Sequence, residues 1–284
     1  MGACRPLLGC RPCGGGPQKG SVVNLIYIVL GTLAAGVGSV LVAALCARAL
    51  LSAYTQHLLS LAAGALLATA FMHLLPEAFE SGASPHQLFI TLLVGLVFFF
   101  LLDKAELWHH GHEHGHAHGH AHGHDHAQDD PPSGMAGSWS VLMGDSIHAF
   151  GDGLLVAAAF LADVQLGVAA TVAVLAHEVP HHMGDLVVLQ QGMGQPRSAL
   201  LKLCLAGGVT VLGGLVGYSL IAGHEEWLPF WLTLASSTYI YVALADLIPQ
   251  LQKRLGASAT VAQIGWLFAG IALVTGVTQL GHVH

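Results

Sequence analysis

The sequence predicts an all-α, polytopic membrane protein with eight transmembrane helices, and three observations carry that prediction. Apolar residues make up 54% of the 284 residues, whereas Asp, Glu, Lys and Arg together make up only 9%. Soluble domains carry about 25% charged residues, so this composition disfavours a soluble enzyme domain and a disordered chain. The apolar residues fall in long stretches, each close to the roughly 20 residues that a helix needs to cross a bilayer. Nine basic residues against 16 acidic ones leave no basic surface for nucleic acid.

The expected spans follow one another with short connections, so little of the chain is left for domains outside the bilayer. Backbone groups in lipid must hydrogen-bond within their own segment, and each span should therefore be a helix. We expect the spans near residues 22–45, 57–79, 88–107, 139–161, 166–190, 198–221, 229–250 and 261–281. This divides the chain into a polar tail (1–21), helices 1–3 (22–107), a histidine-rich loop (108–138), a central pair (139–190) and helices 6–8 (191–284).

Basic residues near the span ends predict the orientation in the membrane. The odd-numbered connections hold Arg48, Lys104, Arg197, Lys202, Lys253 and Arg254, whereas the even-numbered ones, near 80–87, 162–165 and 222–228, hold no Lys or Arg. Basic residues favour the cytoplasmic side. We therefore expect cytoplasmic odd-numbered loops and both termini outside, in a plasma or inner membrane.

Prolines inside three spans predict kinks, because proline cannot donate the backbone hydrogen bond that a helix needs. They are Pro76, Pro180 and Pro249. The run His73–Glu77 also resembles Asp246–Gln250, since both read polar, two apolar, proline, polar. This match favours a 3+2+3 arrangement in which the outer triplets are inverted repeats, a plan that is common among transporters.

Ionisable side chains inside the spans are the main functional signal. Each costs at least about 2.5–3.5 kcal/mol near the bilayer centre, so such groups persist where they have a partner or a cavity. His148 and Asp152 are four residues apart in the fourth span, and His177 and His181 are four apart in the fifth, so each pair shares a helix face. Converging imidazoles and a carboxylate make a divalent transition-metal site. Further candidates along a pathway are His73, Glu77, Asp145, His182, Asp185 and Asp246.

The segment 109–126 holds ten histidines in eighteen positions, which are His109, His110 and every second residue from His112 to His126. Such a tract cannot form a core, and it is typical of a metal-collecting segment. By the orientation argument it is cytoplasmic, where it could accept or buffer metal.

These residues resemble the ZIP family of divalent-metal transporters, and within it the subfamily with a histidine-rich loop. The run His177–Asp185 is similar to the subfamily pattern HE-x-PHE-x-GD, with His182 where Glu is usual. The run His148–Gly153 resembles HN-x-x-DG, with Ala149 where Asn is usual. The resemblance implies a ZIP-like bundle with both termini outside and metal uptake toward the cytoplasm by alternating access. It also implies a primary metal on His148, Asp152 and His181, with His177 and Glu178 nearby.

The transported ion, rather than a resident cofactor, is the expected metal, and zinc is favoured, although Fe²⁺, Mn²⁺ and Cd²⁺ suit the same ligands. Some family members have a second, adjacent site, but Ala149 and a sixth span without acidic residues favour a single one here. The oligomeric state is left open between a monomer and a homodimer. The expected partners are therefore divalent metal ions and the lipid bilayer.

Two other functions fit parts of the sequence. His177-Glu178-Val179-Pro180-His181 matches the H-E-x-x-H pattern of zinc proteases, in which the glutamate is the general base, so an intramembrane metalloprotease is one alternative. A cation-diffusion exporter also uses His and Asp four residues apart. It would be expected to have about six spans and a soluble C-terminal metal domain, whereas this chain ends directly after its last span.

Overall fold

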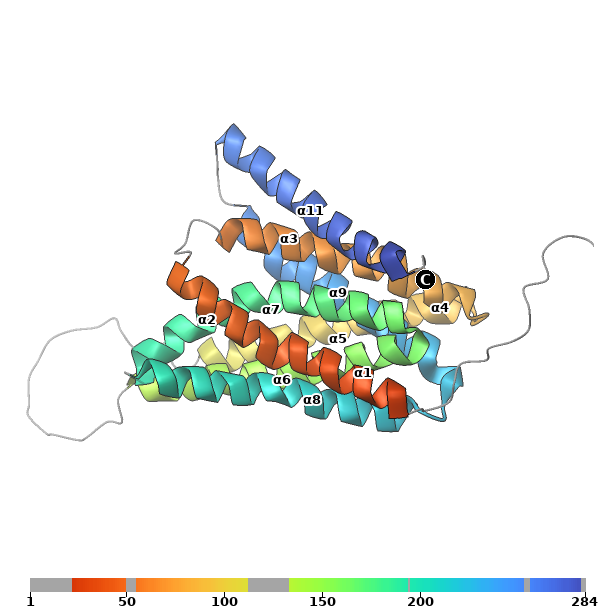
Figure 1. Cartoon of the computed structure of the whole chain (residues 1–284), viewed down its shortest axis with the longest axis horizontal. Helices are drawn as coiled ribbons and strands as arrows, with labels where there is room; N and C mark the ends of the chain where they lie inside the picture. The colour runs from red at the N-terminus through yellow and green to blue at the C-terminus, as the bar shows by residue number, and fades with distance from the viewer. Residues whose placement is uncertain (1–21, 50–54, 112–132, 194, 253–255, 282–284) are drawn as a thin grey trace, which may run out of the picture.

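The computed structural model describes residues 22–49, 55–111, 133–193, 195–252 and 256–281. Long helices fill these ranges, and the ranges contain no strand (Figure 1). The predicted all-α class is therefore confirmed. The polar tail (1–21) and most of the histidine-rich segment lie outside the described residues, so the expectations for them stay predictions.

The helices follow the predicted spans in order, although three spans are divided by π-helical turns. The first span is α1 (Val22–Leu33), η1 (Ala34–Gly38) and α2 (Ser39–Ala49), and the second is α3 (Thr55–Ala68), η2 (Thr69–Leu74) and α4 (Leu75–Glu80). The third is α5 (Pro85–Gly111), followed by the central pair α6 (Ser133–Ala162) and α7 (Val164–Met193). The sixth is α8 (Pro196–Ile221), and the 3₁₀ turn η3 (Glu225–Trp227) leads into the seventh. That span is α9 (Leu228–Tyr241), η4 (Val242–Leu247) and α10 (Ile248–Leu251), and the eighth is α11 (Ala257–Gly281).

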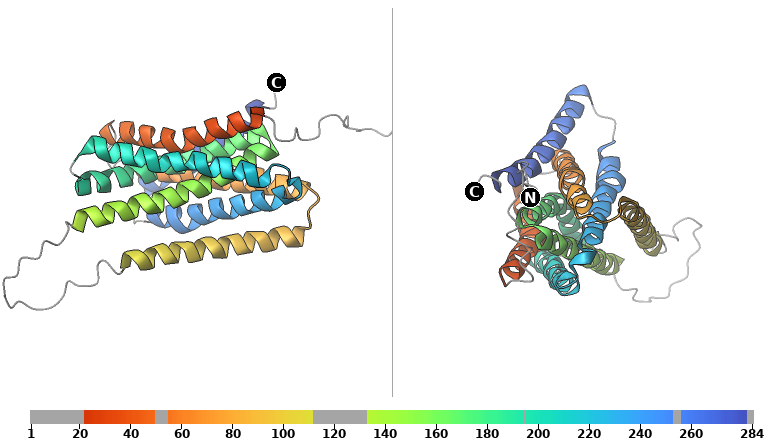
Figure 2. Two further views of the ribbon diagram at one scale, coloured as in Figure 1. Left: turned by 90° about the horizontal axis from the view of Figure 1, so that it is seen from below. Right: turned by 90° about the vertical axis from the view of Figure 1, so that its right-hand side faces the viewer.

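Seven of the described helical stretches are long and apolar enough to cross a membrane. The eighth long helix, α7, has 30 residues and carries five of the eleven predicted ionisable groups, more than any other helix. It packs against α2, α3, α6, α8 and α11, so its neighbours enclose it (Figures 1 and 2). The most polar span is thus shielded by the apolar ones, as expected for a polytopic membrane protein.

The two ends of the bundle differ in the length of their connections. At one end, which we call the turn end, short turns join α4 to α5, α6 to α7 and α8 to η3. Gly82 and Gly223 lie in two of these turns with φ of +83° and +90°, a backbone conformation that side chains with a Cβ rarely adopt. The opposite end, the loop end, holds Gly111 and Ser133, at which α5 ends and α6 begins (Figure 2).

Glycines let the central helix α6 lie directly against α8. A Cβ at Gly153 would overlap the carbonyl oxygen of Thr210, and one at Gly213 would overlap the carbonyl oxygen of Phe150. A Cβ at Gly217 would lie 2.9 Å from the Cβ of Ala157 and 3.2 Å from the Cα of Leu154. Small residues allow such close helix approach inside lipid. Because Gly153 directly follows Asp152, this contact also sets the depth of that aspartate in the bundle.

The outer triplets pack with the symmetry that inverted repeats require. The second span pairs with the eighth through α3 and α11, and the seventh pairs with the third through α9 and α5. In the second span Pro76 is the second residue after π segment η2, and in the seventh Pro249 is the second residue after η4. In these two spans the helix therefore widens into a π-helical turn just before the proline, whereas α7 continues as an α-helix through Pro180.

The turn-end half of the bundle is a continuous apolar core. Its fully buried residues include Leu74, Ala78, Val156, Ala157 and Leu232, which come from the second, fourth and seventh spans. Phe160 of α6 fills the space beside Gly31 and Gly167. This half of the bundle therefore holds close-packed side chains around the central pair.

Two glycines on α6 give a matched test of this packing. Gly153→Ala should lower the stability of the purified protein by about 1–3 kcal/mol, because the added methyl group meets the backbone of α8. Gly151→Ala is the control, since no atom lies within 4 Å of its Cβ position and alanine favours helix. Thermal unfolding in detergent should show a lower Tm for the first variant only. Equal Tm values for both variants would contradict the close contact.

Candidate metal centre

The predicted ionisable residues of α6 and α7 face one another as three successive rungs between antiparallel helices. Asp152 lies opposite His177, His148 lies opposite Glu178 and His181, and Asp145 lies near Asp185. The rungs follow each other by about one helical turn, roughly 5.4 Å. They run from the middle of the bundle toward the loop end, because both Asp145 and Asp185 are the members nearest that end.

The innermost rungs bring four ligand atoms together, and we call His148, Asp152, His177 and Glu178 the inner group. The Nε2 atom of His177 lies 3.3 Å from Asp152 Oδ2 and 3.0 Å from Glu178 Oε1. The Nε2 atom of His148 lies 3.3 Å from Glu178 Oε1 and 3.9 Å from Asp152 Oδ2. All four atoms lie within 4.8 Å of one another.

Several of these atoms are buried without a hydrogen-bond partner among the described residues. They are Asp152 Oδ2, His177 Nε2 and Glu178 Oε1, on side chains that are at most 4% exposed. The Nδ1 atom of His177 lies 3.1 Å from the Ala173 carbonyl oxygen, which can only accept, so Nδ1 carries a proton and donates it. In a neutral ring, Nε2 therefore presents a lone pair toward two carboxylates, an arrangement that a shared cation would stabilise.

Glu178 joins the inner group to a second set of contacts. Its Oε1 belongs to the inner group, while its Oε2 lies 3.1 Å from Nε2 of the fully buried His182. That same nitrogen lies 3.2 Å from Asp145 Oδ1. On the other side of the ring, His182 Nδ1 lies 3.1 Å from Ser39 Oγ, and Ser39 donates its proton to the Gly36 carbonyl oxygen. The first span is thereby tied to the central pair.

The third rung forms a separate set of ligand atoms, which we call the outer group. It consists of Asp145, His181 and Asp185, whose ligand atoms lie within 4.8 Å of one another. His181 Nε2 lies 3.6 Å from Asp185 Oδ2. His181 is therefore beside the inner group, with its ring centroid 6.0 Å from that of His148, rather than within it.

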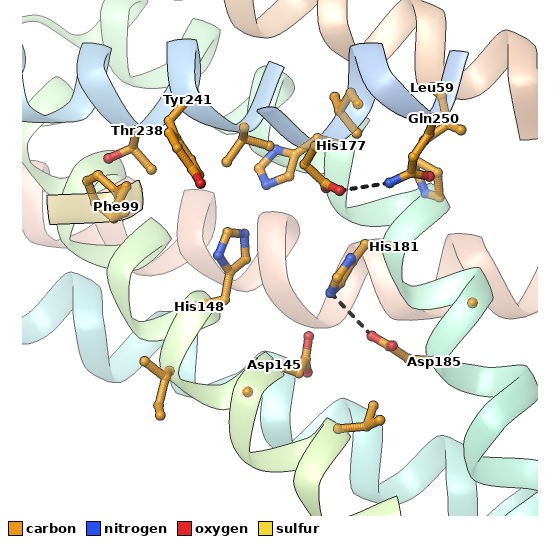
Figure 3. Close-up of a pocket in the computed structure, with 18 of the residues that line it drawn as sticks. Leu59, Phe99, Asp145, His148, His177, His181, Asp185, Thr238, Tyr241 and Gln250 are labelled. Atoms are coloured by element: carbon orange, nitrogen blue, oxygen red, sulfur yellow. Dashed lines mark hydrogen bonds and ion pairs between the residues drawn. The ribbon is translucent and has the colours of Figure 1, made fainter. Parts of the chain in front are cut away.

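A cavity of about 570 Å³ connects the two groups to the loop end of the bundle. It is lined by His148 and His177 of the inner group and by all of the outer group, and Figure 3 shows these side chains converging on it. Its remaining lining comes from the loop-end halves of the spans, including Thr55, Leu102, Val188 and Gln250. Asp152 and Glu178 do not line it, so they lie at its closed end.

The other candidate residues lie away from the inner group. Asp246 lines the cavity near the loop end, and its Oδ1 accepts a hydrogen bond of 2.8 Å from Gln250. His73 lies 3.5 Å from Thr278 Oγ1 of α11, and Glu77 is exposed near the turn end. None of the three therefore contributes a ligand atom to the inner group.

The H-E-x-x-H pattern does not form a shared ligand pair. His177 belongs to the inner group, whereas His181 belongs to the outer group one turn away. Zinc proteases with this pattern place both histidines on one metal and keep the glutamate as a base. Here Glu178 has both of its oxygens in contact with histidines instead.

Two residues near the centre could not be identified as candidate site residues from the sequence. Ser39 sits in a run of small residues, and only the packing of the first span against α7 brings it to His182. Tyr239 of α9 is 1% exposed, and its hydroxyl has no hydrogen-bond partner among the described residues. A lone Ser or Tyr in an apolar span is too common for sequence to single it out.

The charges of the centre are balanced by histidine alone. In every ion pair between described residues the basic partner is a histidine, never Lys or Arg. Four carboxylates, those of Asp145, Asp152, Glu178 and Asp185, thus lie together inside the bundle without a permanently charged side chain opposite them. Unpaired buried carboxylates are costly, so the arrangement favours bound cations.

Comparisons with known proteins agree with this chemistry. A family model described as ZIP zinc transporter matches residues 104–278. Zinc transporter ZIP13 of Pongo abelii is 30% identical over 239 residues, covering 78% of this chain and 66% of that protein. Human zinc transporter ZIP4 is 29% identical over 251 residues, and human ZIP6 is 33% identical over 147. The chain spans 39% of ZIP4 and 19% of ZIP6, so it covers less than two thirds of each of these relatives.

Proposed function

Because the chain belongs to the ZIP family of zinc transporters, we propose that it moves a divalent metal ion, zinc first, into the cytoplasm by alternating access. In this proposal the inner group is the buried binding site of the transported ion. The metal is the transported substrate in this proposal. Fe²⁺, Mn²⁺ and Cd²⁺ suit the same imidazole and carboxylate ligands.

One geometric observation carries the proposal. Zinc binds imidazole nitrogen and carboxylate oxygen at about 2.0–2.2 Å, so neighbouring ligand atoms of a tetrahedral site are about 3.3–3.6 Å apart. The four measured N–O separations of the inner group are 3.0, 3.3, 3.3 and 3.9 Å. Two histidines and two carboxylates at this spacing would also neutralise a dication. His177, which the family resemblance put beside the primary metal, becomes a direct ligand in this proposal.

The cavity supports the proposed direction. It reaches the inner group from the loop end, which the basic residues predict to be cytoplasmic. On the opposite side, the apolar turn-end core fills the space between the inner group and the proposed outside. This is the arrangement expected of an inward-facing state, in which a bound ion can leave toward the cytoplasm. Ions entering from outside require the turn-end core to open.

Removal of one inner ligand should abolish transport. His177→Ala should lower Zn²⁺ uptake into proteoliposomes at least about tenfold, because loss of a ligand weakens metal binding by that order. The matched control is His224→Ala, which removes an exposed histidine at the turn end. Both variants must elute from size-exclusion chromatography like the unmodified protein. Uptake by a well-folded His177→Ala variant at the unmodified rate would contradict the assigned site.

The proposed direction can be checked by chemical access to the cavity. Gly184→Cys should react with a membrane-impermeant thiol reagent in inside-out vesicles, because Gly184 lines the cavity and has open space around it. Ala157→Cys, which is fully buried in the turn-end core, should stay unlabelled. Both variants are made after the native cysteines are replaced by serine. Labelling of Gly184→Cys only from the external face would contradict an inward-facing cavity.

A further inference from the structure

Ser39 in the first span is linked to the inner group by two consecutive polar contacts. Its Oγ lies 3.1 Å from His182 Nδ1, and His182 Nε2 lies 3.1 Å from Glu178 Oε2. Ser39 and His182 are both fully buried, so bulk water does not compete for either contact. Within the described part of the chain, Ser39 makes no polar contact with a member of the inner group. Any effect of Ser39 on a bound ion must therefore pass through His182.

The directions of these hydrogen bonds follow from the single proton of the Ser39 hydroxyl. That proton is donated to the Gly36 carbonyl oxygen at 2.5 Å, so the hydroxyl oxygen is left to accept. His182 Nδ1 therefore carries a proton and donates it to Ser39. With Nδ1 held in this way, the opposite nitrogen of the ring, Nε2, is directed at Glu178 Oε2 and, at 3.2 Å, at Asp145 Oδ1.

Glu178 presents one oxygen to His182 and the other to the inner group. Its Oε2 faces His182, whereas its Oε1 lies 3.0 Å from His177 Nε2 and 3.3 Å from His148 Nε2. The two oxygens belong to one planar group, so a contact that holds Oε2 also restricts the position of Oε1. Contacts of this kind, made by residues behind a ligand, orient the ligand toward its metal.

Close packing between the first span and α8 fixes the position of Ser39. Gly36 lies in the π-helical turn η1, which ends directly before Ser39, and a Cβ at Gly36 would overlap the carbonyl oxygen of Gly207 in α8. Small residues at both positions allow this approach. The Gly36 carbonyl is also the acceptor for the Ser39 hydroxyl, so the residue that touches α8 orients the hydroxyl as well.

Other buried hydroxyls of the bundle do not make a comparable contact. Those of Thr32, Thr233 and Ser236, which are fully buried too, bond only to carbonyl oxygens of their own helices among the described residues. Ser39 makes the same kind of bond and in addition accepts from His182. This additional contact, across to the central pair, is the observation that carries the inference.

We propose that Ser39 is a positioning residue of the metal centre, which holds the His182 ring against Glu178 Oε2 and thereby keeps Glu178 Oε1 in place as a ligand. This role rests on the proposed transport function, because the transported ion is what the positioned carboxylate binds. Without the hydroxyl, the buried Nδ1–H group of His182 has no acceptor, and the ring is free to turn away from Glu178. The inner group then keeps its four ligands but binds the ion less tightly.

The concentration dependence of Zn²⁺ uptake by Ser39→Ala in proteoliposomes tests this role. Its KM should rise about fivefold, somewhat less than the roughly tenfold effect of losing a direct partner of a ligand, because Ser39 acts one contact further away. Vmax should stay close to the unmodified value, since all four ligands remain. A hydroxyl that only supports the fold would leave KM unchanged and lower the amount of active protein, and thus Vmax, instead.

Ser236→Ala is the matched control, because it removes the same hydroxyl from a residue that is equally buried. Its KM should equal that of the unmodified protein. The Tm of the purified, zinc-free protein should fall by a similar amount in both alanine variants, since each loses one hydroxyl bonded to its own helix.

Ser39→Thr and Ser39→Val form a second pair, which tests the hydroxyl independently of whether Ser39→Ala folds. Threonine keeps the hydroxyl, whereas valine replaces it by a methyl group of nearly the same shape. The KM of the valine variant should exceed that of the threonine variant by about fivefold.

The outcomes separate this role from the proposed function. Equal KM values for Ser39→Ala and Ser236→Ala, or for the threonine and valine variants, would overturn the positioning role. If His177→Ala fails to transport in the same assay while KM is unchanged in Ser39→Ala, the positioning role alone is wrong and the proposed function stands. Transport by His177→Ala at the unmodified rate would overturn the proposed site, and the role of Ser39 would fall with it.

Discussion

Carboxylates enclosed by apolar helices, with only histidines to face them, are the constraint on which the rest of this structure depends. Asp152 and Glu178 are 2–3% exposed, and each has an oxygen without a hydrogen-bond partner in the described part of the chain. Such groups cost at least about 2.5–3.5 kcal/mol each inside a bilayer. A bound dication would remove much of that cost. The same charges that make the empty arrangement costly would thus make it selective for divalent cations.

The surrounding helices can be understood as the support that this polar centre needs. Glycines bring the backbone of α8 against α6 beside Asp152, and the helices of five other spans enclose α7. Ser39 of the first span holds His182, which in turn contacts Asp145 and Glu178. These contacts fix the orientation of the ligands from outside the ligand set, and such supporting contacts often decide metal affinity. The apolar turn-end core closes one side, and the cavity leads from the centre toward the loop end.

The architecture could be predicted well from the sequence, because a bilayer allows few backbone structures. Long apolar stretches allow only helices, and the helices follow the expected spans within a few residues at most boundaries. The spacing of His148 from Asp152, and of His177 from His181, also placed each pair on one helix face. The π-helical turns before Pro76 and Pro249 could not be predicted from the sequence. A proline predicts a kink, but it does not predict which backbone hydrogen-bonding pattern the helix adopts around it.

There is a physical reason why the sequence could not predict that His177 and His181 belong to different groups. His177 and His181 share a face but differ by one turn in depth, and only the axial register of α7 against α6 decides which of them meets Asp152. That register is set by close packing between the two helices, for example of Gly167 in α7 against Phe160 in α6, which spacing within one helix does not encode. Glu178 is adjacent to His177 in sequence and turned about 100° around the helix, yet it contacts both His148 of the inner group and the buried His182, one through each carboxylate oxygen.

The location of a bound cation tests the central claim most directly. Crystals of the full chain grown with Cd²⁺ should show an anomalous difference peak inside the inner group, within about 2.5 Å of His148 Nε2, Asp152 Oδ2, His177 Nε2 and Glu178 Oε1. Cadmium takes the same nitrogen and oxygen ligands as zinc and scatters more strongly. A map with peaks elsewhere on the protein and none between these four atoms would contradict the account.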